Sequence, residues 1–250
     1  MSPGFRSGLA PALLGALVAL PVPALAIVGG AEDAGPLSRA AIMVLSSRGG
    51  VCSGVVVAPD AILTAAHCVT GATDYRVHYP DADGRPILLE PSGLAVHPGY
   101  DKGAIVGRRR SIDLALVRLA APLPARFGTA TLSAASPGKG EPVTFGGYGV
   151  SREGEARSTG TFRSVELPAI EPHGRSTILV WAQGAAGAGA CEGDSGGPVA
   201  SGGAVAAVTS WASGSGKKQC GAISQGVLLG PQKTWIDATL AGWGRQASWR

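Results

Sequence analysis

Short apolar runs, rich in Val, Ile, Leu and Ala, recur along the chain and are separated by glycine, proline and small polar residues. Such runs are typical of buried β-strands, and the residues between them are typical of turns. Residues 231–240 have the signals of a helix, because they begin with a proline and Gly242 lies just past their end. The pattern predicts an all-β protein with a C-terminal helix and with strands at Gly54–Val57, Ala61–Thr64, Leu114–Val117, Pro142–Phe145, Thr177–Trp181 and Ala204–Val208.

The first 26 residues follow a different pattern. Arg6 precedes an apolar run, Leu9–Leu20, and Ala24–Ala26 has the small-x-small form of a cleavage site. These are the three parts of a secretory signal peptide, and the run is shorter than the about 20 residues that a membrane span needs. We therefore expect cleavage after Ala26, secretion into the extracellular space or the periplasm, and a mature chain that begins at Ile27 without a membrane attachment.

Composition agrees with a secreted protein that has many turns. The chain has 39 Gly and 18 Pro in 250 residues, and its 45% hydrophobic content argues against disorder. No internal repeat or low-complexity linker divides it. The formal net charge of +4 becomes +3 without the signal segment, which is too small to predict nucleic-acid binding. Four cysteines in a secreted chain predict disulfides, and the residues alone leave three pairings open.

Ser195, in the segment Gly193–Pro198, is the candidate nucleophile. A serine hydroxyl needs a base to take its proton and donors to hold the oxyanion that it creates, and flanking glycines allow a strained turn. The segment could also be a simple surface turn. It fits the Gly-x-Ser-x-Gly motif of α/β-hydrolases as well, but that fold needs a histidine after the serine. All four histidines precede Ser195, which leaves the orders His-Asp-Ser and Asp-His-Ser.

His67 is the best candidate for the base, because it lies in an apolar segment beside Cys68. His78 lies in an alternating stretch, His97 precedes a proline, and His173 lies in a turn-like segment. We expect these three histidines to have structural or solvent-exposed roles.

Asp113 is the best candidate for the acid that orients the base. It opens an apolar run of strand length, and a buried carboxylate is costly unless a group pairs with it. A histidine ring N–H would pair with it and would fix the tautomer that a base needs. The Asp-His-Ser order would instead use Asp60 or Asp33.

Three segments in this order, Thr64–Cys68, Asp113–Leu116 and Gly193–Pro198, resemble the chymotrypsin/trypsin family of serine proteases. The small number of cysteines resembles that of small secreted bacterial members. Further matches extend the resemblance over almost the whole mature chain, at Ile27–Gly30, His97–Tyr100, Gly147–Gly149, Ser210–Trp211 and Trp235–Ile236.

The resemblance implies two six-stranded antiparallel barrels packed face to face, with the site in the cleft between them. His67 and Asp113 would belong to a first barrel over 27–137 and Ser195 to a second over 138–230, followed by a helix and tail at 231–250.

The resemblance also implies the role of each site residue. His67 would act as the base, Asp113 would orient it, and the backbone N–H groups of Gly193 and Ser195 would bind the oxyanion. The α-ammonium of Ile27 would pair with Asp194. Ser210 would support Asp113, and the backbone near Ala212 would pair with an extended substrate. The disulfides would be Cys52–Cys68 and Cys191–Cys220.

The chain departs from the trypsin pattern where specificity is set. Trypsin-like members have an aspartate where this chain has Gly189, and Ala190 follows it. The remaining walls would come from Trp211, Ala212 and Gly226, so the pocket would be uncharged and cleavage would follow apolar residues. Glu192, at the rim, could instead recruit a basic residue, although a rim charge is screened by solvent.

We expect protein or peptide substrates, protein inhibitors as possible partners, a monomer, and neither cofactor nor metal. Asp81–Gly84 is too short a match for a calcium loop, so a solvated turn is expected. Arg108–Arg110 could attract acidic substrates or be a solvated basic loop. The alternative function is a protease-like binding protein that has lost catalysis, against which the intact His67, Asp113 and Ser195 argue.

Overall fold

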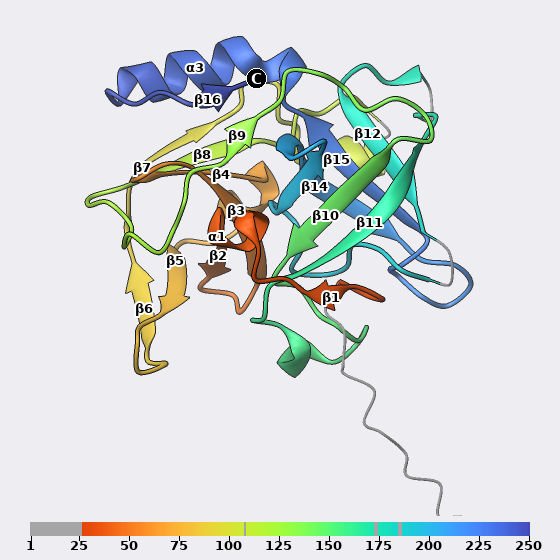
Figure 1. Cartoon of the computed structure of the whole chain (residues 1–250), viewed down its shortest axis with the longest axis horizontal. Coiled ribbons are helices and arrows are strands. Elements are labelled where there is room, and N and C mark those ends of the chain that lie inside the picture. Colours follow the sequence, from red (N-terminus) through yellow and green to blue (C-terminus); the bar gives the residue numbers. More distant parts are fainter. Residues whose placement is uncertain (1–26, 108, 173–174, 185–186) are drawn as a thin grey trace, which may run out of the picture.

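The computed structural model describes residues 27–107, 109–172, 175–184 and 187–250. The predicted signal segment, residues 1–26, lies outside them. Two β-sheets lie side by side, and the C-terminal helix runs along one end of the molecule (Figure 1). In the described part of the chain, no helix is both long and apolar enough to cross a membrane.

The N-terminal half forms a sheet of seven antiparallel strands, β2 (Ala41–Ser46), β3 (Val51–Ala58), β4 (Ala61–Thr64), β5 (Tyr75–Pro80), β6 (Pro86–Leu89), β7 (Pro91–Val96) and β8 (Ala115–Leu119). Their order is β6-β5-β2-β3-β4-β8-β7, and within the described strands no pairing joins the two edges. The sheet is therefore a curled half-barrel, whereas the resemblance implies a closed barrel of six strands.

The C-terminal half is a closed six-stranded antiparallel barrel of β10 (Pro142–Gly147), β11 (Arg163–Ile170), β12 (Leu179–Gln183), β13 (Pro198–Ser201), β14 (Ala204–Ser213) and β15 (Ile223–Leu228). It closes because β13 pairs with both β10 and β14. Three two-residue strands attach to it, β1 (Ala31–Glu32), β9 (Thr131–Leu132) and β16 (Ser248–Trp249). Since β9 pairs with β14, strands of this sheet begin before residue 138.

Among the described residues, helical segments are few and short, except at the C-terminus. They are α1 (Pro36–Arg39), η1 (Ala66–Val69), α2 (Ala104–Gly107), η2 (Ala156–Ser158), η4 (Gly230–Gln232) and α3 (Lys233–Gly242). The predicted C-terminal helix is therefore present, but Gly242 is its last residue rather than the residue beyond its end. Gly244 ends the helix, because it has a φ of 69° and its N–H donates to Ala241 while that of Arg245 donates to Leu240.

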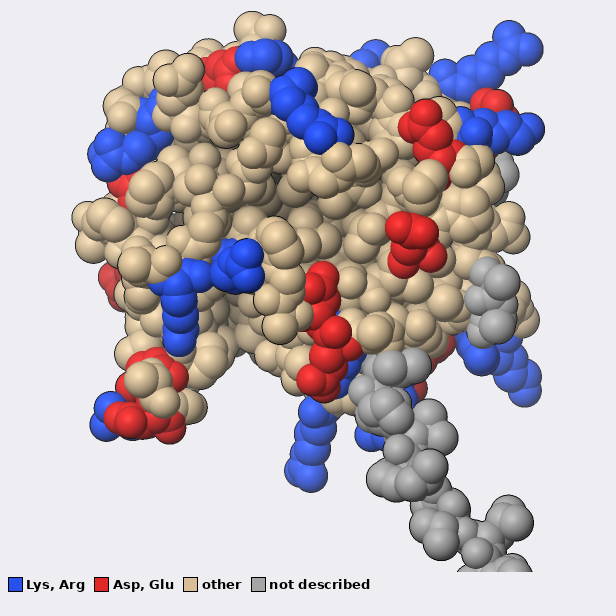
Figure 2. Space-filling view, in the orientation of Figure 1, with Lys and Arg blue, Asp and Glu red and all other residues tan. Residues whose placement is uncertain are grey.

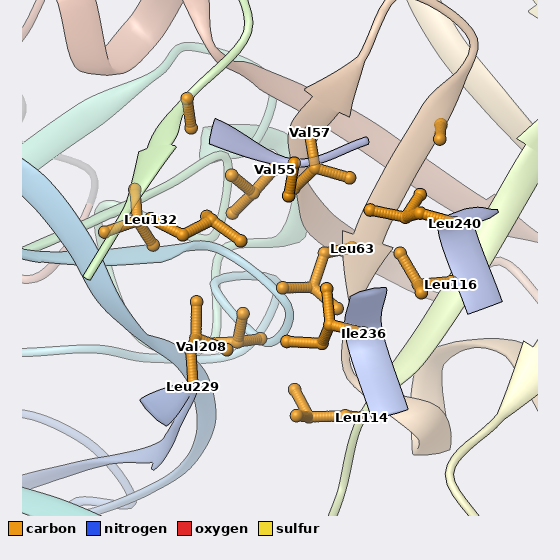
Figure 3. Packing of buried hydrophobic residues seen from close by; sticks show 14 of the residues in the cluster. Val55, Val57, Leu63, Leu114, Leu116, Leu132, Val208, Leu229, Ile236 and Leu240 are labelled. Carbon is orange, nitrogen blue, oxygen red and sulfur yellow. The ribbon is translucent and has the colours of Figure 1, made fainter. Parts of the chain in front are cut away.

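One apolar cluster joins both sheets and α3. Leu63 and Leu116 of the N-terminal sheet, Val208 and Leu229 of the C-terminal half, and Ile236 of α3 belong to it, and Figure 3 shows Leu63 next to Ile236 in the middle of the cluster. All five are 0% exposed, and burying a side chain of this size stabilises the fold by about 1.5–3 kcal/mol. This shared core holds the loops of the two sheets in a fixed relation to each other.

The last residues of the chain are also tied to the N-terminal sheet. Asp60, which is 4% exposed, accepts two hydrogen bonds from the Arg245 guanidinium, at 2.6 and 2.8 Å. Trp249 Nε1 donates to Asp237 of α3 at 2.7 Å. The segment after α3 therefore packs on both halves of the molecule.

Candidate active site

His67 lies in η1, directly after β4, and 40% of its side chain is exposed. The neighbouring Cys68 forms a disulfide with Cys52 of β3, which braces this short helix against the sheet. The Cys68 sulfur lies 3.7 Å from both His67 Nε2 and Ser195 O. The histidine ring and the serine loop therefore meet at this disulfide.

Asp113 lies just before β8, is 8% exposed, and accepts three hydrogen bonds. Its Oδ1 accepts from the backbone N–H of His67 at 2.9 Å, and its Oδ2 lies 2.7 Å from His67 Nδ1. Ser210 Oγ donates to the same Oδ2 at 2.6 Å. Burial would raise the pKa of Asp113, but the hydrogen bonds from His67 and Ser210 and the charge of His67 together hold it below its usual value. Asp113 is thus built to remain an anion beside Nδ1, which leaves Nε2 available to act as a base.

Ser195 lies in a tight loop between the C-terminal barrel and β3. Its carbonyl accepts from Ser53 N–H at 2.7 Å, and Gly196 N–H donates to Thr209 O at 2.7 Å. Gly196 has a φ of 84°, and a side chain there would overlap Ser53 O and Thr64 Oγ1, so glycine is required. Ser195 Oγ has no hydrogen-bond partner within the described residues. Catalytic contacts are often long before substrate binds.

Two backbone N–H groups beside Ser195 are available to a ligand. The N–H groups of Gly193 and Ser195 donate to no described residue, whereas the carbonyl of Glu192 accepts from Val150 N–H at 2.8 Å. The C=O and N–H of a trans peptide point in opposite directions, so this bond turns Gly193 N–H away from Val150. The loop therefore presents two free donors, as stabilisation of an oxyanion requires.

The second disulfide, Cys191–Cys220, braces the same loop from the other side. Both disulfides are the pairs that the resemblance implies. Cys52, His67 and Cys68 form a cluster of atoms within 4.8 Å of one another. Because both sulfurs are in a disulfide, they cannot bind a metal as thiolates.

Asp194 is fully buried and accepts from the N–H groups of Gly149 and Cys191, each at 2.9 Å. Burial raises the pKa of Asp194 to about 7, and the two hydrogen bonds offset this only in part. Ile27 is also fully buried, in a cluster that includes Ala190. Next to it, Val28 O accepts from Gly189 N–H at 2.8 Å. The start of the described chain therefore docks beside the segment that leads to Asp194.

The residues expected to line a specificity pocket are partly brought together. Gly189 and Ala190 are buried, and Ala190 N–H donates to Ser224 Oγ at 2.9 Å. Ala212 pairs with Ser224 across β14 and β15. The ring of Trp211 meets that of Trp181 edge-on, with ring centroids 6.0 Å apart. Glu192, the residue expected at the rim, is exposed.

Gly226 does not lie with this group. A side chain there would contact Val199 and Ala207, which belong to the interior of the C-terminal barrel. Ser224, two residues earlier on β15, occupies the place expected for Gly226, because its Oγ lies beside Gly189 and accepts from Ala190 N–H. The β-bulge between Thr209 and Trp211 shifts the register of β14 against β15, and no sequence signal marks it.

The other histidines and the Arg108–Arg110 segment have no described contact with His67, Asp113 or Ser195. His78 Nδ1 lies 3.0 Å from Ile87 O, and His97 stacks on Trp235 with centroids 4.7 Å apart, while burial lowers the pKa of His97. Arg109 pairs with Asp101. His173 and Arg108 lie outside the described residues.

The Asp81–Gly84 segment forms the turn between β5 and β6. Asp81 accepts from Arg85 N–H and Nε, each at 2.9 Å, and Arg85 also binds Asp83. Both carboxylates of the turn are thus paired with an arginine. Over the face shown in Figure 2, acidic and basic side chains are interspersed rather than gathered by sign.

Comparison with known proteins gives one consistent family. The chain matches the family model described as trypsin over residues 27–236. It is 30% identical to human kallikrein-15 over 205 residues, which cover 72% of this chain and 78% of the relative. It is 28% identical to brachyurin from Leptuca pugilator over 179 residues, which cover 66% of this chain and 77% of the relative. It is 28% identical to trypsin zeta from Drosophila melanogaster over 217 residues, which cover 76% of this chain and 74% of the relative.

Among solved structures, neuropsin, a serine protease expressed in mouse brain, superposes with a TM-score of 0.71. The match has 24% identity and covers 85% of this chain and 99% of that one, and it establishes a common fold. These relatives come from animals, so the expected likeness to bacterial members stays a prediction. The family match, which spans most of the chain, shows that this protein belongs to the trypsin family of serine proteases.

Proposed function

We propose that this protein is a secreted serine endopeptidase that cleaves peptide bonds through a covalent acyl-enzyme. The observation that carries the proposal is the buried Asp113 carboxylate, 2.7 Å from His67 Nδ1, with Ser195 held across the same disulfide.

The proposed reaction uses the arrangement described above. His67 Nε2 takes the proton of Ser195 as its oxygen attacks the substrate carbonyl, and Asp113 stabilises the resulting imidazolium. The N–H groups of Gly193 and Ser195 bind the oxyanion. The His67 proton then passes to the leaving amine, and a water activated by His67 releases the acyl group from Ser195.

The contacts of Asp60 and Asp33, the two other candidate acids, support Asp113 as the residue that orients His67. Asp60 is occupied by Arg245, and Asp33 Oδ1 accepts from Gly35 N–H at 2.6 Å. Neither carboxylate shares a hydrogen bond with His67, so the Asp-His-Ser order has no support among the described contacts. The alternative of a silent binding protein predicts that His67, Asp113 or Ser195 is replaced, or that the Asp113–His67 contact is lost, and all of these are present.

The test is hydrolysis of short chromogenic peptides by the mature protein and by Ser195→Ala. We expect turnover by the first and loss of at least about 10⁴-fold in kcat by the second, with unchanged folding by circular dichroism. Equal rates for the two proteins, or no turnover of any peptide or protein substrate by the first, would contradict the proposal.

For specificity, we propose cleavage after apolar residues. Gly189 and Ala190 bring no charge to the segment where trypsin-like members carry an aspartate, and Ser224 Oγ is held by Ala190 N–H. An Arg or Lys side chain of a substrate would therefore find no carboxylate at this base. In a panel that varies only the residue before the scissile bond, we expect Phe, Tyr, Leu or Met to exceed Arg by at least tenfold in kcat/KM. Fastest turnover after Arg would refute this specificity and leave the proposed reaction intact.

We also propose that Ile27 is the mature N-terminus and that its α-ammonium pairs with Asp194. Ile27 is already buried, yet it has a φ of 44°, a strained conformation for a β-branched residue. Cleavage of the preceding peptide bond abolishes this dihedral constraint and creates a cation near a buried carboxyl that lacks one. N-terminal sequencing of the active secreted protein should read Ile-Val-Gly-Gly, and a different start would sink this part of the proposal.

A further inference from the structure

Ser53 is a buried polar residue that the proposed reaction does not use. It lies on β3 beside Cys52, and it is 0% exposed. Its position is on the N-terminal sheet, 140 residues before Gly193 in sequence. A hydroxyl at such a site is costly unless its hydrogen bonds are made.

Each polar group of Ser53 is hydrogen-bonded, and three of the four bonds cross to the C-terminal half. Its Oγ donates to Gly193 O at 3.0 Å and accepts from Tyr148 N–H at 2.9 Å. Its backbone N–H donates to Ser195 O at 2.7 Å. Its own carbonyl accepts from Thr64 Oγ1 at 2.7 Å. Two of these four bonds hold the loop whose N–H groups would bind the oxyanion.

These bonds complete a set that fixes every carbonyl of residues 192–195. Glu192 O accepts from Val150 N–H at 2.8 Å, and Asp194 O accepts from Gly197 N–H at 2.9 Å. Gly193 O and Ser195 O are both held by Ser53. The free N–H groups of Gly193 and Ser195 belong to the peptides of Glu192 O and Asp194 O, and Ser53 holds the peptide that follows each of these. With all four consecutive peptide planes held, the two free N–H groups keep their directions.

Gly193 is the residue at which this control matters most. It has a φ of 95°, and glycine adopts many backbone conformations at low cost. Of the described contacts, only Ser53 Oγ binds the Gly193 carbonyl, and it does so from the other sheet. Loss of the hydroxyl would free the peptide between residues 193 and 194 and leave the Tyr148 N–H without its acceptor.

We infer that Ser53 is a positioning residue for the oxyanion-binding loop, acting through the Gly193 carbonyl. The inference rests on the proposed function, because it assigns a catalytic consequence to the free N–H groups. Direct loss of one oxyanion donor costs about 10²–10³ in kcat, so loss of its support should cost less, about tenfold.

The experiment compares the mature protein with Ser53→Ala and with the matched control Ser133→Ala. Ser133 is another buried serine, 6% exposed, whose Oγ bonds only to the backbone of Ala135, and it makes no contact with the loop. For each protein we would measure kcat and KM, normalised by the number of active sites. We would also measure the affinity for a peptidyl trifluoromethyl ketone, which forms an oxyanion, and for the matching peptidyl alcohol, which presents no anionic oxygen.

For Ser53→Ala we expect about tenfold lower kcat, a KM within twofold of the parent, and a similar loss of affinity for the ketone alone. Ser133→Ala should be unchanged in all three. An unchanged kcat and ketone affinity in Ser53→Ala, or an equal loss for both inhibitors or in Ser133→Ala, would overturn the inference. If Ser53→Ala does not fold, Ser53→Thr and Ser53→Val give the same comparison, because the two side chains have the same shape and the hydroxyl of threonine is a methyl group in valine.

The two proposals fail in different ways. Absence of turnover by the parent protein would remove the proposed function and this inference with it. Turnover by the parent together with an unaltered Ser53→Ala would remove this inference alone.

Discussion

Asp113 and Asp194 are both buried carboxyls, and their surroundings give them opposite tendencies. Asp113 has hydrogen bonds from His67 and Ser210 that offset its burial, so its pKa is lowered. Asp194 has only two backbone N–H partners, and its pKa is raised to about 7. The environment of Asp113 favours its charged form, whereas that of Asp194 disfavours the charged form, which a nearby cation would stabilise.

Replacing Asp113 by Asn should lower kcat by about 10⁴-fold at neutral pH, the magnitude seen in the general template for this triad. An amide in that place favours the wrong His67 tautomer, with the proton on Nε2. Asp60→Asn serves as the matched control, because Asp60 binds Arg245 and makes no described contact with the site. The measurement is kcat by peptide hydrolysis, and an equal effect of the two substitutions would count against the assignment of Asp113.

The pKa of Asp194 predicts a pH dependence for a chain extended before Ile27. The folded pKa of about 7 exceeds the ordinary value of 3.8, so the folded state binds the proton more tightly. This stability is fully present below the unfolded pKa and is lost as pH rises toward about 7. Urea unfolding should therefore show a falling free energy of unfolding over that range. The fall should be smaller in the chain that starts at Ile27, and it should vanish in extended Asp194→Asn. A flat profile for the extended chain would contradict the interpretation.

At the scale of elements, local signals predict strands well and their ends less well. The predicted strand at Ala61–Thr64 coincides with β4, whereas β12 begins two residues after the expected Thr177. The end of α3 is the clearest difference, because Gly242 and Gly244 are both plausible stops and only the backbone reveals which has positive φ.

A pair of substitutions tests this helix end. Gly244→Ala should lower the free energy of unfolding by about 1 kcal/mol, since alanine is strained at a φ of 69°. Gly242→Ala should raise it by about 0.5–1 kcal/mol, because this residue is helical and a methyl group there meets nothing within 4 Å. Denaturant unfolding measures both, and a reversed order would show that the helix ends at Gly242.

At the scale of the whole molecule, both sheets, α3 and the C-terminal segment share one core. The chymotrypsin-like fold and the pairing of the cysteines could be expected from the family resemblance, which is carried by motifs around His67, Asp113 and Ser195. The open N-terminal sheet, the shifted register that places Ser224 rather than Gly226 beside Ala190, and the contacts of Ser53 depend on partners distant in sequence. Serine at position 53 or 224 is unremarkable until its neighbours across the fold are known.

The segment after α3 should contribute to stability and not to turnover. Removing residues 245–250 leaves the buried Asp60 without Arg245 and deletes β16, so we expect a lower Tm than that of the parent. The kcat per active site, measured well below Tm, should be unchanged. Arg250→Ala, at the exposed end, is the control and should keep the parent Tm. An unchanged Tm after the deletion would show that the segment is dispensable.

Covalent labelling by a fluorophosphonate, followed by mass spectrometry of the mature protein, tests the central claim most directly. We predict one adduct per molecule, located on Ser195, no adduct in Ser195→Ala, and labelling slowed by at least about 10³-fold in His67→Ala. Failure of the folded mature protein to react, or an adduct on another residue that persists in Ser195→Ala, would contradict the account.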